Sequence, residues 1–221
     1  MKNDRRRFIG TAATLLSASL AYPKSGFSIL DLKGLNTIRI GVIGTGSRGM
    51  GLMRILSKME GVTMVALCDT LPFRLKEASQ IAPKAKTYIR HLDLLENKEL
   101  DAVIISTPLS THAQIATEAV DANVHVYCEK TMVKGAKDTV QLVNKVLTNP
   151  KKIFQTGHQY HSSRLYSHAV ELIQGGKIGK VNGIRAQWNR NGNWRRPVPD
   201  EKFERQINWR MYREYSYGLL A

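Results

Sequence analysis

The sequence predicts an α/β protein built on a doubly wound parallel sheet. From residue 37 onward, short runs of β-branched and apolar residues alternate with longer segments of helical periodicity. A glycine-rich turn follows the first run, and polar or charged residues follow several of the others. Parallel strands need long crossovers, usually helices, so this alternation favours a parallel sheet over hairpins.

The expected elements are taken in chain order. Apolar runs predict strands at 37–44, 62–69, 101–107, 125–130 and 152–160, with a short and ambiguous one at 87–91. Amphipathic or capped segments predict helices at 47–59, 71–82, 91–100, 110–123 and 136–149. After residue 158 a further helix ends at Gly175-Gly176, and residues 180–192 alternate like a half-buried strand before loops rich in Trp, Arg and Pro.

The first 36 residues have the character of a leader. Arg5, Arg6 and Arg7 precede an apolar, small-residue stretch from Phe8 to Ala21, which is typical of an export signal. Arg5 and Arg6 resemble the paired arginines of twin-arginine signals, which direct folded proteins to the periplasm. A disordered basic terminus is the alternative. We expect a signal peptide and linker at 1–36, a nucleotide-binding domain at 37–157 and an incomplete second domain at 158–221.

Composition excludes some classes of protein. The chain is 43% hydrophobic and 23% charged, as in ordinary globular proteins. No apolar run reaches the roughly 18–20 residues that span a bilayer. The net charge of +15 suggests nucleic-acid binding, but basic residues are scattered among acidic ones, without a single basic helix or an aromatic RNA motif. We therefore expect neither a nucleic-acid partner nor a membrane span.

The two cysteines are expected to be free. Cys68 and Cys128 close strands that a doubly wound order places three positions apart, or roughly 14 Å. A disulfide needs α-carbons within about 7 Å. We expect two partly buried thiols.

A glycine motif identifies the candidate cofactor site. Gly44, Gly46 and Gly49 have G-x-G-x-x-G spacing between a strand and a helix, the context of a dinucleotide-binding Rossmann fold. The glycines permit a tight turn, close approach of pyrophosphate and close helix packing, while the helix N-terminus attracts phosphate. The intervening candidates for cofactor contact are Thr45, Ser47 and Arg48.

Asp69 is the candidate for ribose recognition. It ends the second strand, 20 residues after Gly49, where a carboxylate commonly binds ribose hydroxyls. A carboxylate repels a 2′-phosphate, which favours NAD. Arg48 and Arg74 are placed to accommodate NADP instead, and the sequence leaves the choice open.

Other candidates follow later strands, at the edge of the sheet where open α/β proteins bind ligands. Ser106, Thr107 and Pro108 follow the strand at 101–107, and His112 opens the next helix as either a cofactor contact or a packing residue. Glu129 and Lys130 end the following strand and are expected at the cofactor, although a surface ion pair is the alternative.

Three segments together resemble the Gfo/Idh/MocA (glucose–fructose oxidoreductase / inositol dehydrogenase) family: "IRIGVIGTGSRG", "STPLSTHAQIATEAVDANVHVYCEKTM" and "QTGHQYHSSRLYSHAVELIQGGKIGKV". The resemblance implies a Rossmann domain followed by an α+β domain with an open antiparallel sheet. It also implies hydride transfer between NAD(P) and a sugar, cyclitol or related polyol, and we expect a homo-oligomer at full length.

The resemblance also assigns roles to individual residues. The family's E-K-P motif falls on Glu129, Lys130 and Thr131, with threonine in place of proline, and implies that Lys130 is catalytic. Gln159 is implied at the cofactor and Arg164 at the substrate. The family's later catalytic segment lies beyond Ala221, so this piece alone is expected to be inactive.

Aromatic and basic residues near the C-terminus are candidates for carbohydrate contact. Trp194, Arg195 and Arg196 are either sugar-facing or structural. Alternatives to a simple dehydrogenase are a redox-assisted, NAD-dependent glycosidase and a non-catalytic NAD(P)-binding protein. No metal site is expected.

Overall fold

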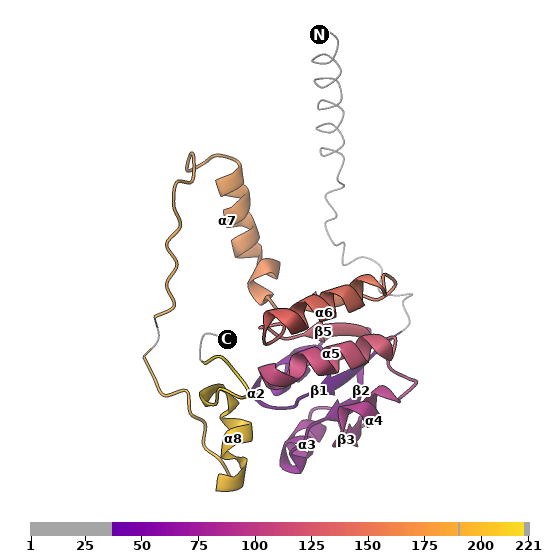
Figure 1. Cartoon of the computed structure of the whole chain (residues 1–221). Coiled ribbons are helices and arrows are strands. Elements are labelled where there is room, and N and C mark those ends of the chain that lie inside the picture. Colours follow the sequence, from indigo (N-terminus) through magenta and orange to yellow (C-terminus); the bar gives the residue numbers. More distant parts are fainter. Residues whose placement is uncertain (1–36, 190, 219–221) are drawn as a thin grey trace. The chain divides into compact units, whose positions relative to one another are not determined.

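The computed structural model describes residues 37–189 and 191–218. The expected leader at 1–36, with Arg5 and Arg6, lies outside the described residues. Six parallel strands form one sheet in the order β3-β2-β1-β4-β5-β6, which confirms the doubly wound Rossmann topology (Figure 1). The strands are β1 (Ile38–Ile43), β2 (Val62–Cys68), β3 (Lys86–Tyr88), β4 (Ala102–Ile105), β5 (His125–Cys128) and β6 (Phe154–Thr156).

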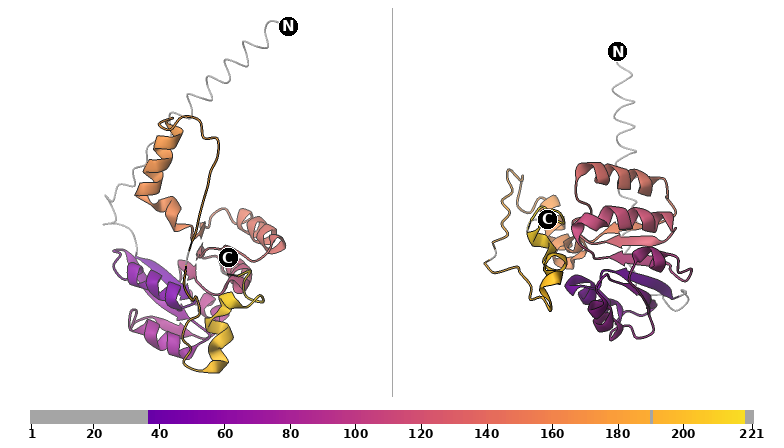
Figure 2. Two further views of the ribbon diagram at one scale, coloured as in Figure 1. Left: turned by 90° about the vertical axis from the view of Figure 1, so that its left-hand side faces the viewer. Right: turned by 60° about the horizontal axis from the view of Figure 1, so that its bottom comes forward.

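Helices cover both faces of the sheet, and each face has its own core (Figure 2). One face packs α2 (Ser47–Leu56) and α3 (Pro72–Ser79) through buried Met53 and Leu75. The other packs α4 (His91–Leu95), α5 (His112–Asp121) and α6 (Ala136–Leu147). The α4 helix has five residues, about half of the expected segment, and η2 (Leu109–Thr111) precedes α5.

The strand register aligns the carboxyl ends of five of the six strands. Ile43 pairs with both Cys68 and Ile105, Ile105 pairs with Cys128, and Cys128 pairs with Thr156. These residues form one row across the sheet, so the residues that follow them leave the sheet together. They are Gly44, Asp69, Ser106, Glu129 and Gly157.

Cys68 and Cys128 are free, and their strands lie three positions apart as expected, but both thiols are buried rather than partly buried. Burial raises the pKa of both thiols to about 12, with smaller contributions from the neighbouring carboxylates of Asp69 and Glu129 respectively.

The chain after β6 departs from expectation. It forms η3 (Gln159–Ser162) and α7 (Arg164–Gln174), and then residues 180–189 run without assigned secondary structure and with exposed side chains. The strand expected at 180–192 is therefore wrong for the residues described there. Alternation of apolar and polar residues suits a strand only where a neighbouring strand accepts its hydrogen bonds, and none of the described strands pairs with this segment.

The final described segment returns to the nucleotide-binding domain. It contains η4 (Glu201–Phe203), α8 (Glu204–Ile207) and η5 (Trp209–Met211). The Lys134 ammonium donates to the carbonyl oxygens of Arg213 (2.6 Å) and Glu214 (2.7 Å), and Ser110 N–H donates to that of Tyr215 (3.1 Å). The segment is thus attached beyond the carboxyl ends of β4 and β5. In the described part of the chain, no helix combines the length and apolar character needed to cross a bilayer.

Candidate functional site

The glycine-rich turn joins β1 to α2 and is closely packed. Gly44 has φ +89°, and a Cβ there would lie 2.8 Å from the backbone of Ser106. A Cβ on Gly49 would lie 2.0 Å from the Gly44 carbonyl oxygen, so only glycine allows the helix to start this close to the strand. Ser106 Oγ donates to the same carbonyl at 2.6 Å, which links the turn to the end of β4.

The N-terminus of α2 fits a phosphate-bearing cofactor. Its N-cap is Gly46, no side chain caps it, and its first turn holds no acidic residue. The N–H groups of a helix start carry partial positive charge and bind phosphate when they are not capped. Ser47 is the first residue of the helix. Gly46 has no side chain, and a Cβ there would lie 3.2 Å from Arg74 Nη1, so the Arg74 guanidinium lies beside the start of the helix.

Asp69 follows β2 next to the glycine turn, as expected. Its carboxylate, however, points toward that turn. Its carboxylate accepts hydrogen bonds from Thr45 N–H (2.8 Å), Thr45 Oγ1 (3.2 Å) and Leu71 N–H (3.0 Å). Each carboxylate oxygen accepts about two hydrogen bonds, so Oδ1 retains one position for a ribose hydroxyl. Asp69 therefore holds the turn in place, and its predicted ribose contact remains a prediction.

The arginine beside Asp69 is Arg74, not Arg48. Arg74 Nη1 lies 4.0 Å from Asp69 Oδ2. Arg48 instead reaches across the edge to β5, where its Nε donates to Glu129 Oε1 at 2.8 Å. Of the two arginines considered for NADP, only Arg74 is near Asp69, the carboxylate predicted to discriminate between the cofactors.

Replacing Asp69 with alanine is expected to weaken NAD binding by about tenfold or more, because a charged hydrogen-bond acceptor and the brace on Thr45 are lost together. Discrimination against NADP should relax in the same variant. Calorimetric titration of both cofactors measures the effect, with Glu77→Ala on the exposed face of α3 as control. A wild-type protein that prefers the 2′-phosphorylated cofactor would contradict the assignment.

The side chain of His112 fixes the position of the loop after β4. Its imidazole is buried, with Nδ1 2.9 Å from the Thr131 carbonyl oxygen and Nε2 2.9 Å from the Thr107 carbonyl oxygen. His112 therefore ties the loop that follows β4 to the turn that follows Lys130. The structure favours the packing role for His112, whereas Pro108 lies in the loop itself and accepts a hydrogen bond from Thr111.

Glu129 is the centre of a polar cluster at the end of β5. It is buried and ion-paired with Arg48 from α2, whose guanidinium also donates to Gln159 Oε1 at 3.0 Å. Tyr127 Oη donates to Glu129 Oε1 at 3.3 Å. The cluster joins the glycine side of the crevice to the ends of β5 and β6, so three residues expected from sequence, Arg48, Glu129 and Gln159, meet here.

Lys130 leaves the sheet beside this cluster. Its backbone N–H donates to Glu129 Oε2 at 3.2 Å, and its side chain is exposed. No described carboxylate forms an ion pair with its ammonium, which argues against the alternative of a surface ion pair. The peptide bond between Lys130 and Thr131 is cis.

Sequence reasoning missed Tyr127 and Gly157. Burial, followed by the Glu129 carboxylate, raises the pKa of the Tyr127 phenol, which therefore remains a donor to that carboxylate. A Cβ on Gly157 would lie 2.7 Å from the Tyr127 hydroxyl and 3.0 Å from Glu129 Oε1. The sequence signal for Gly157 is its position directly after a strand, at the edge of the sheet where the other candidate residues lie.

Arg164, Trp194 and Arg195 were expected at the substrate. Among the described residues, no contact links any of them to the strand ends. Arg164 begins α7 and is exposed. Arg195 pairs with Glu204 at 3.1 Å, and Trp194 is 38% exposed. No group of His, Cys, Asp or Glu in the described chain is placed to hold a metal ion.

The fold and this edge define a dinucleotide-binding domain of an oxidoreductase. Residues 38–158 match the family described as "Oxidoreductase family, NAD-binding Rossmann fold" (GFO_IDH_MocA). The chain belongs to this family, which confirms the resemblance found in the sequence, and it carries the family's NAD-binding domain.

Individual relatives extend the comparison. The inositol 2-dehydrogenase of Salmonella typhimurium is 32% identical over 146 residues, which are 65% of this chain and 44% of the relative. A glycosyl hydrolase family 109 protein of Shewanella pealeana is 28% identical over 237 residues, covering 96% of this chain and 51% of the relative. A crystal structure of Lactobacillus casei scyllo-inositol dehydrogenase with NAD(H) and scyllo-inositol has a TM-score of 0.63 and 25% identity over 65% of this chain and 43% of that one.

The chain thus spans about half the length of the curated relatives it matches.

Proposed function

We propose that the protein is an NAD-dependent oxidoreductase that acts on a hydroxyl group of a sugar, cyclitol or related polyol. The observation that carries the proposal is the alignment of the glycine turn, Asp69 and the Glu129–Lys130 pair at one edge of the sheet. Relatives named as inositol dehydrogenases support this substrate class.

In the proposed reaction, different residues of the chain bind the cofactor and act on the substrate. The free helix N-terminus at Gly46 binds the pyrophosphate, and Asp69 binds the adenosine ribose. When bound, nicotinamide supplies the hydride acceptor or donor. Lys130 donates a hydrogen bond to the substrate oxygen, which gains negative character as the C–H bond breaks, and so stabilises that charge. A general base removes the hydroxyl proton.

Incubating the full-length protein with NAD and a panel of cyclitols and sugars tests the proposal. We expect absorbance of the reduced cofactor to appear in proportion to a ketone product. Absence of NAD binding would reject the assignment of the site, whereas binding without turnover on any sugar or polyol would favour a non-catalytic role.

A second candidate is a redox-assisted glycosidase. Its support is the extent of the match: the family 109 glycosyl hydrolase aligns over 96% of this chain, whereas the inositol 2-dehydrogenase aligns over 65%. In such a reaction a sugar would be oxidised, lose its glycosidic substituent by elimination, add water across the resulting double bond, and be reduced again with the hydride it first gave up. Cleavage of a nitrophenyl glycoside without net accumulation of reduced cofactor identifies this reaction, and a stoichiometric ketone product identifies the dehydrogenase.

We also propose that the protein is exported by the twin-arginine route. The leader-like sequence around Arg5 and Arg6 supports this, because that route carries folded proteins and a cofactor bound in the cytoplasm would travel with them. Replacing both arginines with lysine is expected to retain the precursor in the cytoplasm, as followed by fractionation and immunoblotting. Replacing Lys2 is the matched control, and unchanged export of the double variant would contradict the proposal.

A further inference from the structure

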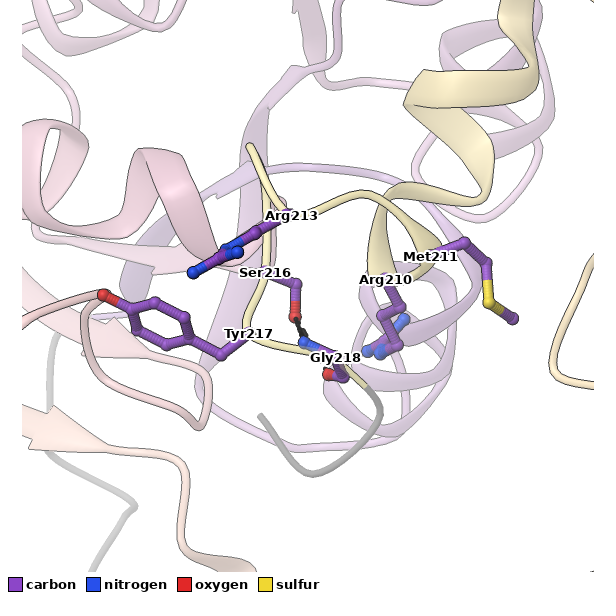
Figure 3. Close-up of a pocket in the computed structure, with 6 residues that line it drawn as sticks. All are labelled: Arg210, Met211, Arg213, Ser216, Tyr217 and Gly218. Carbon is purple, nitrogen blue, oxygen red and sulfur yellow. Dashed lines mark hydrogen bonds between the residues drawn. The ribbon is translucent and has the colours of Figure 1, made fainter.

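The final described segment contains a pocket that the proposed cofactor chemistry does not use. It measures about 380 Å³, within the range of small-molecule sites, and is lined by Arg210, Met211, Arg213, Ser216, Tyr217 and Gly218 (Figure 3). Two of the six lining residues are arginines and none is acidic. Figure 3 shows the two arginine side chains on either side of the turn formed by Ser216 and Gly218.

The pocket lies on the same side of the sheet as the catalytic candidates. The carbonyl oxygens of residues 213–215 are held by Lys134, which follows β5, and by Ser110, which follows β4. Those two strands end at Ile105 and Cys128, and Lys130, the proposed catalytic residue, follows the second of them. A group bound in the pocket would therefore belong to the substrate.

The arginines of the pocket have no carboxylate partner among the described residues. The nearby acids are each paired with a different arginine: Glu214 with Arg205, Glu204 with Arg195, and Glu129 with Arg48. The Arg210 guanidinium stacks on the Trp209 ring at 4.1 Å. Two arginines therefore line the pocket without a carboxylate partner among the described residues, of which Arg210 is partly buried and Arg213 is exposed.

The environment of Arg210 makes this arrangement costly without a ligand. Burial lowers the pKa of its guanidinium, the positive charge of Arg196 lowers it further, and Glu129 opposes them. An arginine keeps its charge in proteins, so the cost appears as free energy rather than as proton loss. An oxyanion in the pocket would offset both the desolvation of Arg210 and its repulsion by Arg196.

We propose that the pocket around Arg210 and Arg213 binds the oxyanion of an acidic carbohydrate, so that the substrate carries a carboxylate or an ester-linked sulfate or phosphate. This rests on the proposed function, because it names the class of sugar on which that site acts. The planar guanidinium fork of Arg210 matches two oxygens of such a group.

Calorimetry on the NAD-loaded, full-length protein tests the proposal. The probes are glucose, glucuronate and glucose 6-phosphate, with inorganic phosphate as a separate titrant. We expect one of the acidic sugars to bind about ten- to hundredfold more tightly than glucose, as a charged hydrogen-bonded pair allows. The arms with glucuronate and glucose 6-phosphate distinguish a carboxylate from an ester.

Arg210→Gln should remove this preference and leave NAD affinity unchanged. The control is Arg185→Gln, because Arg185 is exposed and is not among the pocket residues. Should Arg210→Gln fail to fold, the wild-type protein provides a second measurement, since the preference must fall as ionic strength rises.

Several outcomes overturn the proposal. Equal binding of acidic and neutral sugars, including no detectable binding of either, would do so, and so would inorganic phosphate that binds as tightly as the sugar phosphate. A loss of NAD affinity in Arg210→Gln would reassign the arginine to the cofactor. If the wild-type protein binds no NAD, the proposed function itself fails; if it binds NAD without preferring acidic sugars, only this inference fails.

Discussion

Lys130→Met is expected to lower turnover of the full-length protein by roughly 100-fold or more, the range for loss of an acid–base or electrostatic group. Methionine keeps the length and apolar stem of lysine but cannot donate to an oxygen that is gaining charge. NAD affinity should change little, because the residues assigned to the cofactor phosphates and ribose lie at the ends of β1 and β2.

Single-turnover measurement of hydride transfer, alongside titration with NAD, separates the two effects. Lys137→Met is the matched control, because Lys137 is an exposed lysine at the start of α6. If turnover survives in Lys130→Met while NAD affinity collapses, Lys130 is a cofactor anchor and the catalytic role is wrong.

Gly49→Ala is expected to destabilise the fold by about 1–3 kcal/mol and to weaken NAD binding severely, because the backbone must move to admit one methyl group. The added Cβ would lie 2.0 Å from the Gly44 carbonyl oxygen and 2.8 Å from Ser106 Oγ. Neither the turn nor the start of α2 can relax without moving the N–H groups proposed to bind the pyrophosphate.

Gly51→Ala provides the control within the same helix. A Cβ at Gly51 meets no atom within 4 Å, so the change should leave NAD binding intact and stabilise the helix by up to about 1 kcal/mol. Thermal unfolding and NAD titration of both variants test the contrast. Equal stability of the two variants would show that the turn is looser than the structure indicates.

Much of the fold could be predicted from sequence because the relevant signals are local. The alternation of strand-like runs with helical segments indicates a parallel sheet, and in such a sheet the residues after each strand meet at one edge. This reasoning placed Asp69 and Glu129 together with the glycine turn. It also placed Cys68 and Cys128 on strands too far apart for a disulfide.

The remaining features depend on contacts that no local pattern encodes. Arg48 was considered for a cofactor phosphate, but its long side chain reaches Glu129, a residue 81 positions away. The direction of the Asp69 carboxylate depends on the N–H of Thr45, which only the folded turn brings near. The alternation at 180–192 predicts a strand, yet a strand also needs a neighbouring strand to pair with, and periodicity gives no information about one.

The attachment of the final segment bears on how this protein can change its substrate. Lys134 and Ser110 hold three consecutive carbonyl groups, at residues 213–215, and every amino acid presents the same carbonyl. Side chains in this stretch are thus free to vary without detaching it from the catalytic edge. Under the proposed function, mutation could therefore exchange the groups proposed to meet the substrate without altering the residues proposed for hydride transfer, which makes the segment a target for redirecting specificity by directed evolution.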